Sequence, residues 1–167
     1  LTLKGHERPI TYVQYSTDGD LVFSTGKDKK CTVWYTNNGE RLGTYDGHHG
    51  AISECDINYT CDKLLTGATD MEVAIWDAQS GKRLGAITHQ APLHSVQWAC
   101  GDKALLAVSS NKFGFPPLVH VYRLEDDLFK NNGVLDSEDI DTHMELGGNK
   151  KDSKISNTDT IIRARWG

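Results

Sequence analysis

The sequence lacks the features that mark several common classes of protein. No run approaches the ~18 consecutive apolar residues of a membrane-spanning helix, and no stretch has the basic start, apolar core and small-residue cleavage site of a secretory signal. The cysteines show neither C-x-x-C spacing nor a paired Cys/His arrangement, so we expect reduced thiols and no zinc site. These cysteines are Cys31, Cys55, Cys61 and Cys100. We therefore expect a soluble, cytoplasmic protein.

Three further absences concern local structure and catalysis. No stretch has the 3.6-residue apolar period of a substantial helix. No glycine-rich phosphate loop is present, and no G-x-S-x-G nucleophile elbow surrounds Ser24. We therefore expect a chain built from strands, with no cofactor.

The sequence does contain an internal repeat, in which one pattern occurs twice. Each copy begins with a Gly-His pair, which ends at His6 in the first copy and at His48 in the second. Alternating apolar residues follow, and a tryptophan, Trp34 or Trp76, lies near the end of the pattern. Both tryptophans lie 28 residues after their histidine, and the copies are offset by 42 residues. A Gly-His opening, a Trp-Asp close and a period of about 40–45 residues are typical of the WD40 propeller blade.

Turn signals divide each copy into four short strands, as a propeller blade requires. We expect strands at 10–15, 21–24, 31–35 and 41–45 in the first copy, and at 52–57, 64–66, 73–76 and 83–87 in the second. The predicted fold class is all-β, a WD40 β-propeller.

A third copy is present in degraded form. His89 follows His48 by 41 residues, and 93–98, 105–108 and 119–122 match the first three strands. Tyr122 stands in place of the tryptophan, after a turn at 111–117 that is five residues longer, and no aspartate aligns with Asp70. We expect Tyr122 to be equivalent to the two tryptophans. We also expect 144–146 to form the outer strand, and 160–166 to open a fourth copy.

The net charge of −5 is concentrated in residues 124–154, which contain nine acids and four lysines. We expect 125–141 to be the least buried stretch, because so many charges with few β-forming residues cannot build a core. For residues 136–141, a solvated loop and a partner-binding loop both remain open. A Ca²⁺ site is disfavoured, since D-x-D-x-D-G spacing is missing.

His6, Ser24 and Asp28 have the composition of a Ser-His-Asp catalytic system. The same set recurs at the same spacing in the second copy, whereas an active site needs a single nucleophile. We therefore predict a structural network in each blade, with the imidazole between an aspartate and a hydroxyl and the tryptophan beyond. Its predicted members are His6, Ser24, Asp28 and Trp34 in the first copy and His48, Thr66, Asp70 and Trp76 in the second. No catalytic and no metal-binding residues are predicted.

Other candidate sites are weaker. His48 and His49 could bind a metal, but adjacent side chains point apart. The basic turn at Lys27, Lys29 and Lys30 has no interleaved aromatic residues, so direct nucleic-acid binding is not expected. The apolar turn at 113–117 could pack against the propeller or dock a partner.

Several stretches go beyond the general repeat. Residues 38–45, after Val33-Trp34-Tyr35, resemble the subunit i family of eukaryotic translation initiation factor three, as does the Tyr35 that replaces aspartate. Further similar stretches are 3–8, 10–11, 20–23, 27–28, 47–48, 50–51, 64–68, 152–155 and 164–167. The resemblance is dense in residues 1–77 and weaker beyond.

The resemblance implies a seven-bladed propeller of which this chain is the amino-terminal part. Blade one would span about 4–45, blade two about 46–87, blade three about 88–154 and the start of blade four about 155–167. Because blades bury their faces only against neighbours, we expect the inter-blade face of the third blade that points away from blade two, and the edge of 160–166, to be bare.

The implied function is a non-catalytic scaffold in the initiation factor three complex. It would contact subunits b and g and, indirectly, the small ribosomal subunit, with no direct nucleic-acid or membrane contact. One alternative is an adaptor similar to serine-threonine kinase receptor-associated protein. A hydrolase using Ser24 is the alternative from another class.

Overall fold

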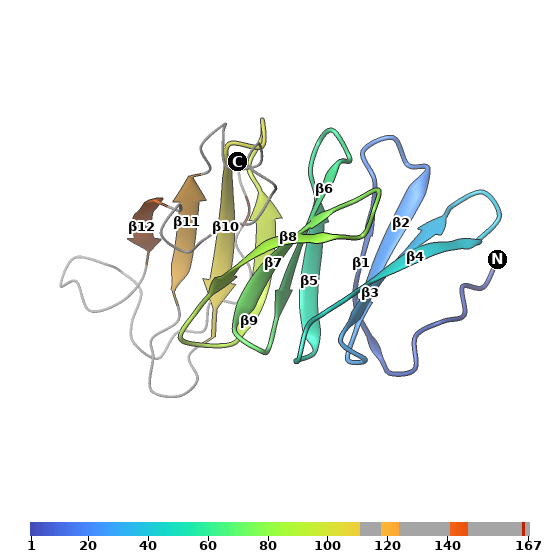
Figure 1. The fold of residues 1–167 in the computed structure, drawn as a ribbon, viewed down its shortest axis with the longest axis horizontal. Coiled ribbons are helices and arrows are strands. Elements are labelled where there is room, and N and C mark those ends of the chain that lie inside the picture. Colours follow the sequence, from blue (N-terminus) through green and yellow to red (C-terminus); the bar gives the residue numbers. More distant parts are fainter. Residues whose placement is uncertain (111–117, 124–140, 147–164, 166–167) are drawn as a thin grey trace.

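The computed structural model describes residues 1–110, 118–123, 141–146 and 165. Within these residues every regular element is a strand, and the strands form three four-stranded antiparallel sheets that stand side by side (Figure 1). No helix in the described part of the chain is long and apolar enough to cross a membrane. The fold class is therefore the predicted one, all-β.

Each sheet is a meander of consecutive strands. Blade one contains β1 (Ile10–Tyr15), β2 (Leu21–Gly26), β3 (Lys30–Tyr35) and β4 (Arg41–Asp46). Blade two contains β5 (Ile52–Ile57), β6 (Lys63–Ala68), β7 (Glu72–Asp77) and β8 (Arg83–Thr88). Blade three contains β9 (Leu93–Trp98), β10 (Ala104–Ser109), β11 (Val119–Arg123) and β12 (Asp141–Leu146). Every strand expected in the first two copies is present, some longer by one to three residues.

Blade three keeps the register of the other two blades. Trp34, Trp76 and Tyr122 each pair with the second residue of the neighbouring strand, namely Val22, Leu64 and Leu105. In each blade the pairing of the third and fourth strands also shifts just before this aromatic residue. The predicted equivalence of the three aromatic residues is confirmed. The outer strand expected at 144–146 is confirmed as well, as the end of β12.

The turns repeat together with the strands. Lys29 and Met71 occupy the same turn position in blades one and two, and both have φ of 70°. In another turn Gly19 has φ of 82° and its counterpart Cys61 has φ of 57°. Left-handed backbone is costly for residues with a Cβ, so the turn geometry is imposed by the strands on either side.

The core lies between the blades. One buried cluster joins blades one and two, and a second joins blades two and three. The first contains Phe23, Cys31, Val33 and Tyr45 from blade one and Ile52, Cys55, Ile57, Leu64, Ala68, Ala74 and Trp76 from blade two. Each of these two clusters therefore needs residues from two neighbouring blades, as expected for stacked repeats.

The bare apolar face is on blade one. Ile10, Val13 and Tyr15 of β1 are 55%, 50% and 63% exposed. Their counterparts on β5, which are Ile52, Cys55 and Ile57, are 0%, 1% and 7% exposed, because blade one covers them. The repeat pattern does not predict this face, because Ile10 and Ile52 occupy equivalent positions in their strands.

The expectation of a bare inter-blade face on blade three, on the side away from blade two, is wrong for the described residues. Leu106, Val108 and Val119 are buried and form a cluster of their own, with Val121 packed against it. The expectations for 111–117, for 125–140 and for a fourth opening strand at 160–166 lie outside the described residues, apart from Arg165.

Candidate functional site

The side chains predicted to form a network in blade one are within hydrogen-bond distance of one another. His6 Nδ1 lies 2.8 Å from Asp28 Oδ2, and His6 Nε2 lies 2.8 Å from Ser24 Oγ. Trp34 Nε1 donates to the same Ser24 Oγ at 2.8 Å. With the proton on His6 Nδ1, each group donates once along a chain from tryptophan to serine to histidine to aspartate.

Blade two repeats this geometry. His48 Nδ1 lies 2.9 Å from Asp70 Oδ2, His48 Nε2 lies 2.8 Å from Thr66 Oγ1, and Trp76 Nε1 donates to Thr66 Oγ1 at 2.8 Å. Asp70 Oδ2 also accepts the backbone N–H groups of His49 and Gly50, at 2.7 and 3.2 Å. The aspartate therefore fixes both the imidazole and the chain entering β5.

Each member of the network comes from a different element of its blade. The histidine precedes the first strand, the hydroxyl is on the second strand, the aspartate is in the next turn and the tryptophan is on the third strand. The glycine before each histidine lies against the indole ring. A Cβ at Gly5 would lie 2.6 Å from Trp34, and one at Gly47 would lie 3.0 Å from Trp76. This close approach explains the Gly-His pair.

The network also sets the charge state of its aspartates. Burial by itself would raise the pKa of Asp70, but the hydrogen bond and charge of His48, together with the His49 and Glu72 N–H groups, outweigh it and hold this pKa well below its usual range. The pKa of Asp28 is lowered in the same way, by His6 and the Glu7 N–H against the effect of burial. Both aspartates are therefore ionised acceptors at neutral pH.

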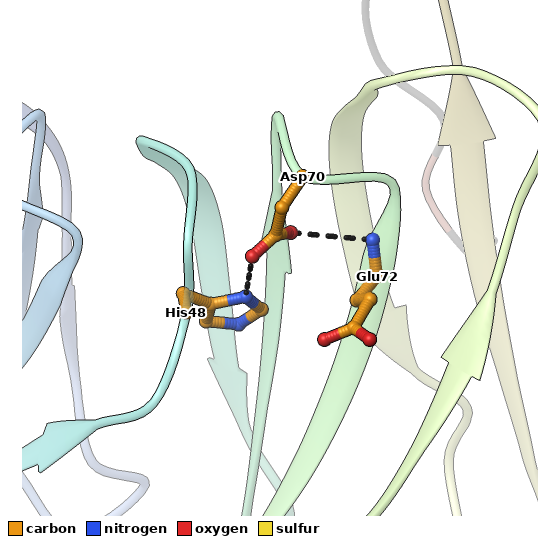
Figure 2. A group of neighbouring side chains, drawn as sticks. All are labelled: His48, Asp70 and Glu72. Atoms are coloured by element: carbon orange, nitrogen blue, oxygen red, sulfur yellow. Dashed lines mark hydrogen bonds and ion pairs between the residues drawn. The ribbon is translucent and has the colours of Figure 1, made fainter.

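A possible metal cluster overlaps the blade-two network. Ligand atoms of His48, Asp70 and Glu72 lie within 4.8 Å of one another, and Figure 2 shows the three side chains with Asp70 between the other two. Both ring nitrogens of His48 already have partners, and Glu72 is paired with Arg83 at 2.7 Å. Since these ligand atoms are engaged, the group does not favour a metal ion.

Blade three replaces the network with a different contact. Ala107 pairs with His120 at the position where Ser24 pairs with Thr32, so no hydroxyl is available there. The buried His89 instead has the Tyr122 hydroxyl at 3.5 and 3.4 Å from its two ring nitrogens, with the ring planes at 82°. These near-equal, long distances indicate a contact to the ring face rather than a hydrogen bond to one nitrogen.

His120 completes this cluster in blade three. Its ring centroid lies 4.8 Å from that of His89, in an edge-on arrangement, and its ring stacks on Tyr122. Burial, followed by the nearby His120, lowers the pKa of His89 to about 3. The His89 imidazole is therefore neutral at physiological pH. Sequence reasoning missed His120, because no repeated position marks it.

Polar contacts between the blades were also missed. Thr11 Oγ1 donates to the Ile52 carbonyl at 2.6 Å, and Ser53 Oγ donates to the Leu93 carbonyl at 2.7 Å. Thr11 and Ser53 occupy the same repeat position, next to the irregularity in strand pairing at the start of β1 and β5. Their shared position was the signal that could have identified them.

Comparison with known proteins agrees with the repeats. The family described as "WD domain, G-beta repeat" matches residues 1–35 and 39–77. Eukaryotic translation initiation factor 3 subunit I of Schizosaccharomyces pombe is 43% identical over 124 residues, covering 74% of this chain and 38% of that protein. The protein of the same name from Caenorhabditis elegans is 52% identical over 95 residues, covering 57% and 29%.

Solved structures agree on the fold alone. The structure titled "Crystal structure of RRP9 WD40 repeats" superposes with a TM-score of 0.70 at 22% identity, covering 89% of this chain and 41% of that one. The "Structure of U3-55K" gives the same TM-score and identity, with 87% and 41% covered. The chain spans well under half the length of the curated relatives it matches. By its repeats, its blades and these relatives, the chain belongs to the WD-repeat family of eukaryotic translation initiation factor 3 subunit I.

Proposed function

We propose that the chain is part of a non-catalytic scaffold subunit of the translation initiation factor 3 complex. The observation that carries this proposal is the 43% identity to the fission-yeast subunit I across three quarters of the chain. The presence of two complete side-chain networks within residues 1–77, where the WD-repeat family matches, supports a rigid rather than a reactive role.

Rigidity is the physical basis of the scaffold role. The blade-two network holds the chain between β4 and β5 against the indole ring of Trp76, and the blade-one network holds the chain that leads into β1 against Trp34. The turns and strand edges of the blades then present fixed positions to a partner segment, which loses less entropy on binding a surface that is already ordered.

The hydrolase alternative has little support from the geometry. Ser24 is buried, and its Oγ already contacts both His6 Nε2 and Trp34 Nε1. A nucleophilic serine needs room for a substrate and an oxyanion hole. Reaction with a fluorophosphonate probe tests this point. We expect no labelling, and a label on Ser24 would support the hydrolase hypothesis.

The proposed partners follow from the family. The assembled subunit would bind other initiation factor 3 subunits, with subunits b and g as the specific proposals, and would lie near the small ribosomal subunit in the cytoplasm. The proposal includes no direct contact with nucleic acid or membrane. An adaptor similar to serine-threonine kinase receptor-associated protein is not favoured, because the relatives described above are all subunit I proteins.

The experiment that tests this function is affinity purification of the full-length protein from cell extract, read by mass spectrometry. We expect initiation factor 3 subunits in near-equal amounts. A variant with an exposed substitution such as His49→Ala should recover the same set. Recovery of an unrelated complex without initiation factor 3 subunits would contradict the proposal.

A further inference from the structure

The inner strand of blade two carries two buried carboxylates on one face. Glu54 and Asp56 lie two residues apart on β5, and both are buried. Each accepts a backbone N–H from β9: Glu54 Oε2 from Val96 at 3.1 Å, and Asp56 Oδ2 from Trp98 at 2.6 Å. The equivalent positions on β1 are Tyr12 and Gln14, so the pair belongs to blade two.

The other oxygens of these carboxylates face residues from blade one and from the far end of the chain. Gln14 Nε2 donates to Asp56 Oδ1 at 2.5 Å. Arg165 Nη2 donates to Glu54 Oε1 at 2.6 Å, and the same nitrogen lies 3.2 Å from the Tyr12 hydroxyl. One guanidinium therefore bridges β1 and β5, from a position more than a hundred residues along the chain.

The charges favour this arrangement. Two carboxylates close together in a buried site are costly unless a cation compensates them. A guanidinium is well suited because it is weakly hydrated and has several donors in a fixed plane. Burial raises the pKa of Asp56, which Gln14, the Trp98 N–H and the charge of Arg165 partly oppose. The Glu54 pairing raises the pKa of Arg165 against the effect of its own burial.

We propose that β1 and β5 form a guanidinium-binding site, built from Glu54 and Tyr12 beside Asp56, and that Arg165 of the same chain fills it. The contact fixes the inner edges of blades one and two through a residue that follows blade three. Folding of the first two blades is therefore coupled to this distant arginine. The inference does not depend on the proposed function.

Chemical rescue tests the site directly. Arg165→Ala in the full chain should lower Tm by about 2–4 °C, roughly the shift of a lost partly exposed ion pair. Ethylguanidinium at millimolar concentration should restore Tm in Arg165→Ala and leave the unsubstituted chain unchanged. Ethylammonium and sodium chloride at equal ionic strength are the matched controls. Arg8→Ala, at an exposed arginine, should shift Tm little and show no rescue.

Repeating the experiment in a Glu54→Gln variant tests whether the rescue depends on the Glu54 carboxylate. In Glu54→Gln, the further change Arg165→Ala should have little effect and ethylguanidinium should restore nothing. If Arg165→Ala does not fold, refolding yield with and without ethylguanidinium provides the same readout. The proposal is overturned if the two substitutions act additively, if Arg165→Ala leaves Tm unchanged, or if ethylammonium rescues as well as ethylguanidinium.

Discussion

Blades two and three share a strand framework but differ in how the chain entering the blade is held. In blade two, His48 has partners at 2.9 and 2.8 Å on both ring nitrogens. In blade three, His89 has the Tyr122 hydroxyl at 3.4–3.5 Å and the ring of His120 beside it. The register of the aromatic residue is nevertheless the same in both. Strand pairing and apolar packing therefore set the register, and the network is an addition that holds one connection.

The two blades also differ in charge. Blade two holds an ionised aspartate, whose pKa is lowered because His48 outweighs the effect of burial. Blade three holds a neutral histidine, whose pKa burial lowers. As the pH is lowered, blade three should therefore be destabilised at a higher pH than blade two. The following predictions test this comparison, from the largest effect to the smallest.

Removing the Asp70 carboxylate should destabilise blade two. Asp70→Ala should lower the free energy of unfolding by about 1–3 kcal/mol, because His48 and two N–H groups lose their acceptor. Denaturant unfolding measures the change. Asp46→Ala, at an exposed aspartate, is the control and should cost far less. Equal losses in the two variants would mean that the network contributes nothing.

Lowering the pH should weaken blade three before blade two. The pKa of His89 is lowered from 6.5 to about 3 in the folded protein, so its stabilising effect is complete above pH ~6.5 and is lost as pH falls towards 3. Between pH 7.5 and 5 the loss should be about 1–2 kcal/mol. The contribution of Asp70 is complete above its unfolded pKa of 3.8 and is lost only below that.

Hydrogen exchange followed by mass spectrometry separates the two blades. At pH 5, after correction for intrinsic rates, amides of β10 and β11 should exchange faster than at pH 7.5, while those of β6 and β7 stay unchanged. His89→Phe should reduce the pH dependence. Uniform loss of protection in both blades would show that His89 is not the titrating group.

Returning the missing hydroxyl should make blade three more like blade one. Ala107→Ser places a hydroxyl at the position that Ser24 occupies in blade one. We expect a gain of about 0.5–1.5 kcal/mol in unfolding free energy from the new hydrogen bond. Thermal unfolding measures it, with Ala74→Ser in blade two as the matched control. A loss as large as that of the control would mean that His89 does not occupy the place of His6.

The smallest effect concerns the turns that blades one and two share. Lys29→Gly should raise stability by about 0.4–1 kcal/mol, because φ of 70° strains a residue with a Cβ. Gly19→Ala, at φ of 82°, should act in the opposite direction. Denaturant midpoints compare the two. A destabilising Lys29→Gly would show that its side chain contributes more than the backbone strain costs.

Much of the fold could be predicted because its signals are local and repeated. The alternation of apolar residues located the strands, and the 28-residue spacing placed His6 and His48 with their partners. The matched spacing also identified Tyr122 as the counterpart of the tryptophans. These features depend only on residues within one blade, so one sequence contains all the information they need.

What could not be predicted depends on neighbouring blades. Ile10 and Ile52 occupy the same position in two similar strands, yet Ile10 is exposed and Ile52 is buried, because blade one covers Ile52. Alternation also predicts that Glu54 and Asp56 face water, whereas both are buried against β9. Their burial is decided by the packing of another blade.

A double-mutant cycle in blade two tests the central claim most directly. The cycle combines Asp70→Ala with Thr66→Val, two residues that contact opposite nitrogens of the His48 ring. If the network acts as one structural unit, the two losses in unfolding free energy should fall short of additivity by about 0.5–3 kcal/mol. Fully additive losses would contradict the account, because His48 would then not couple its two partners.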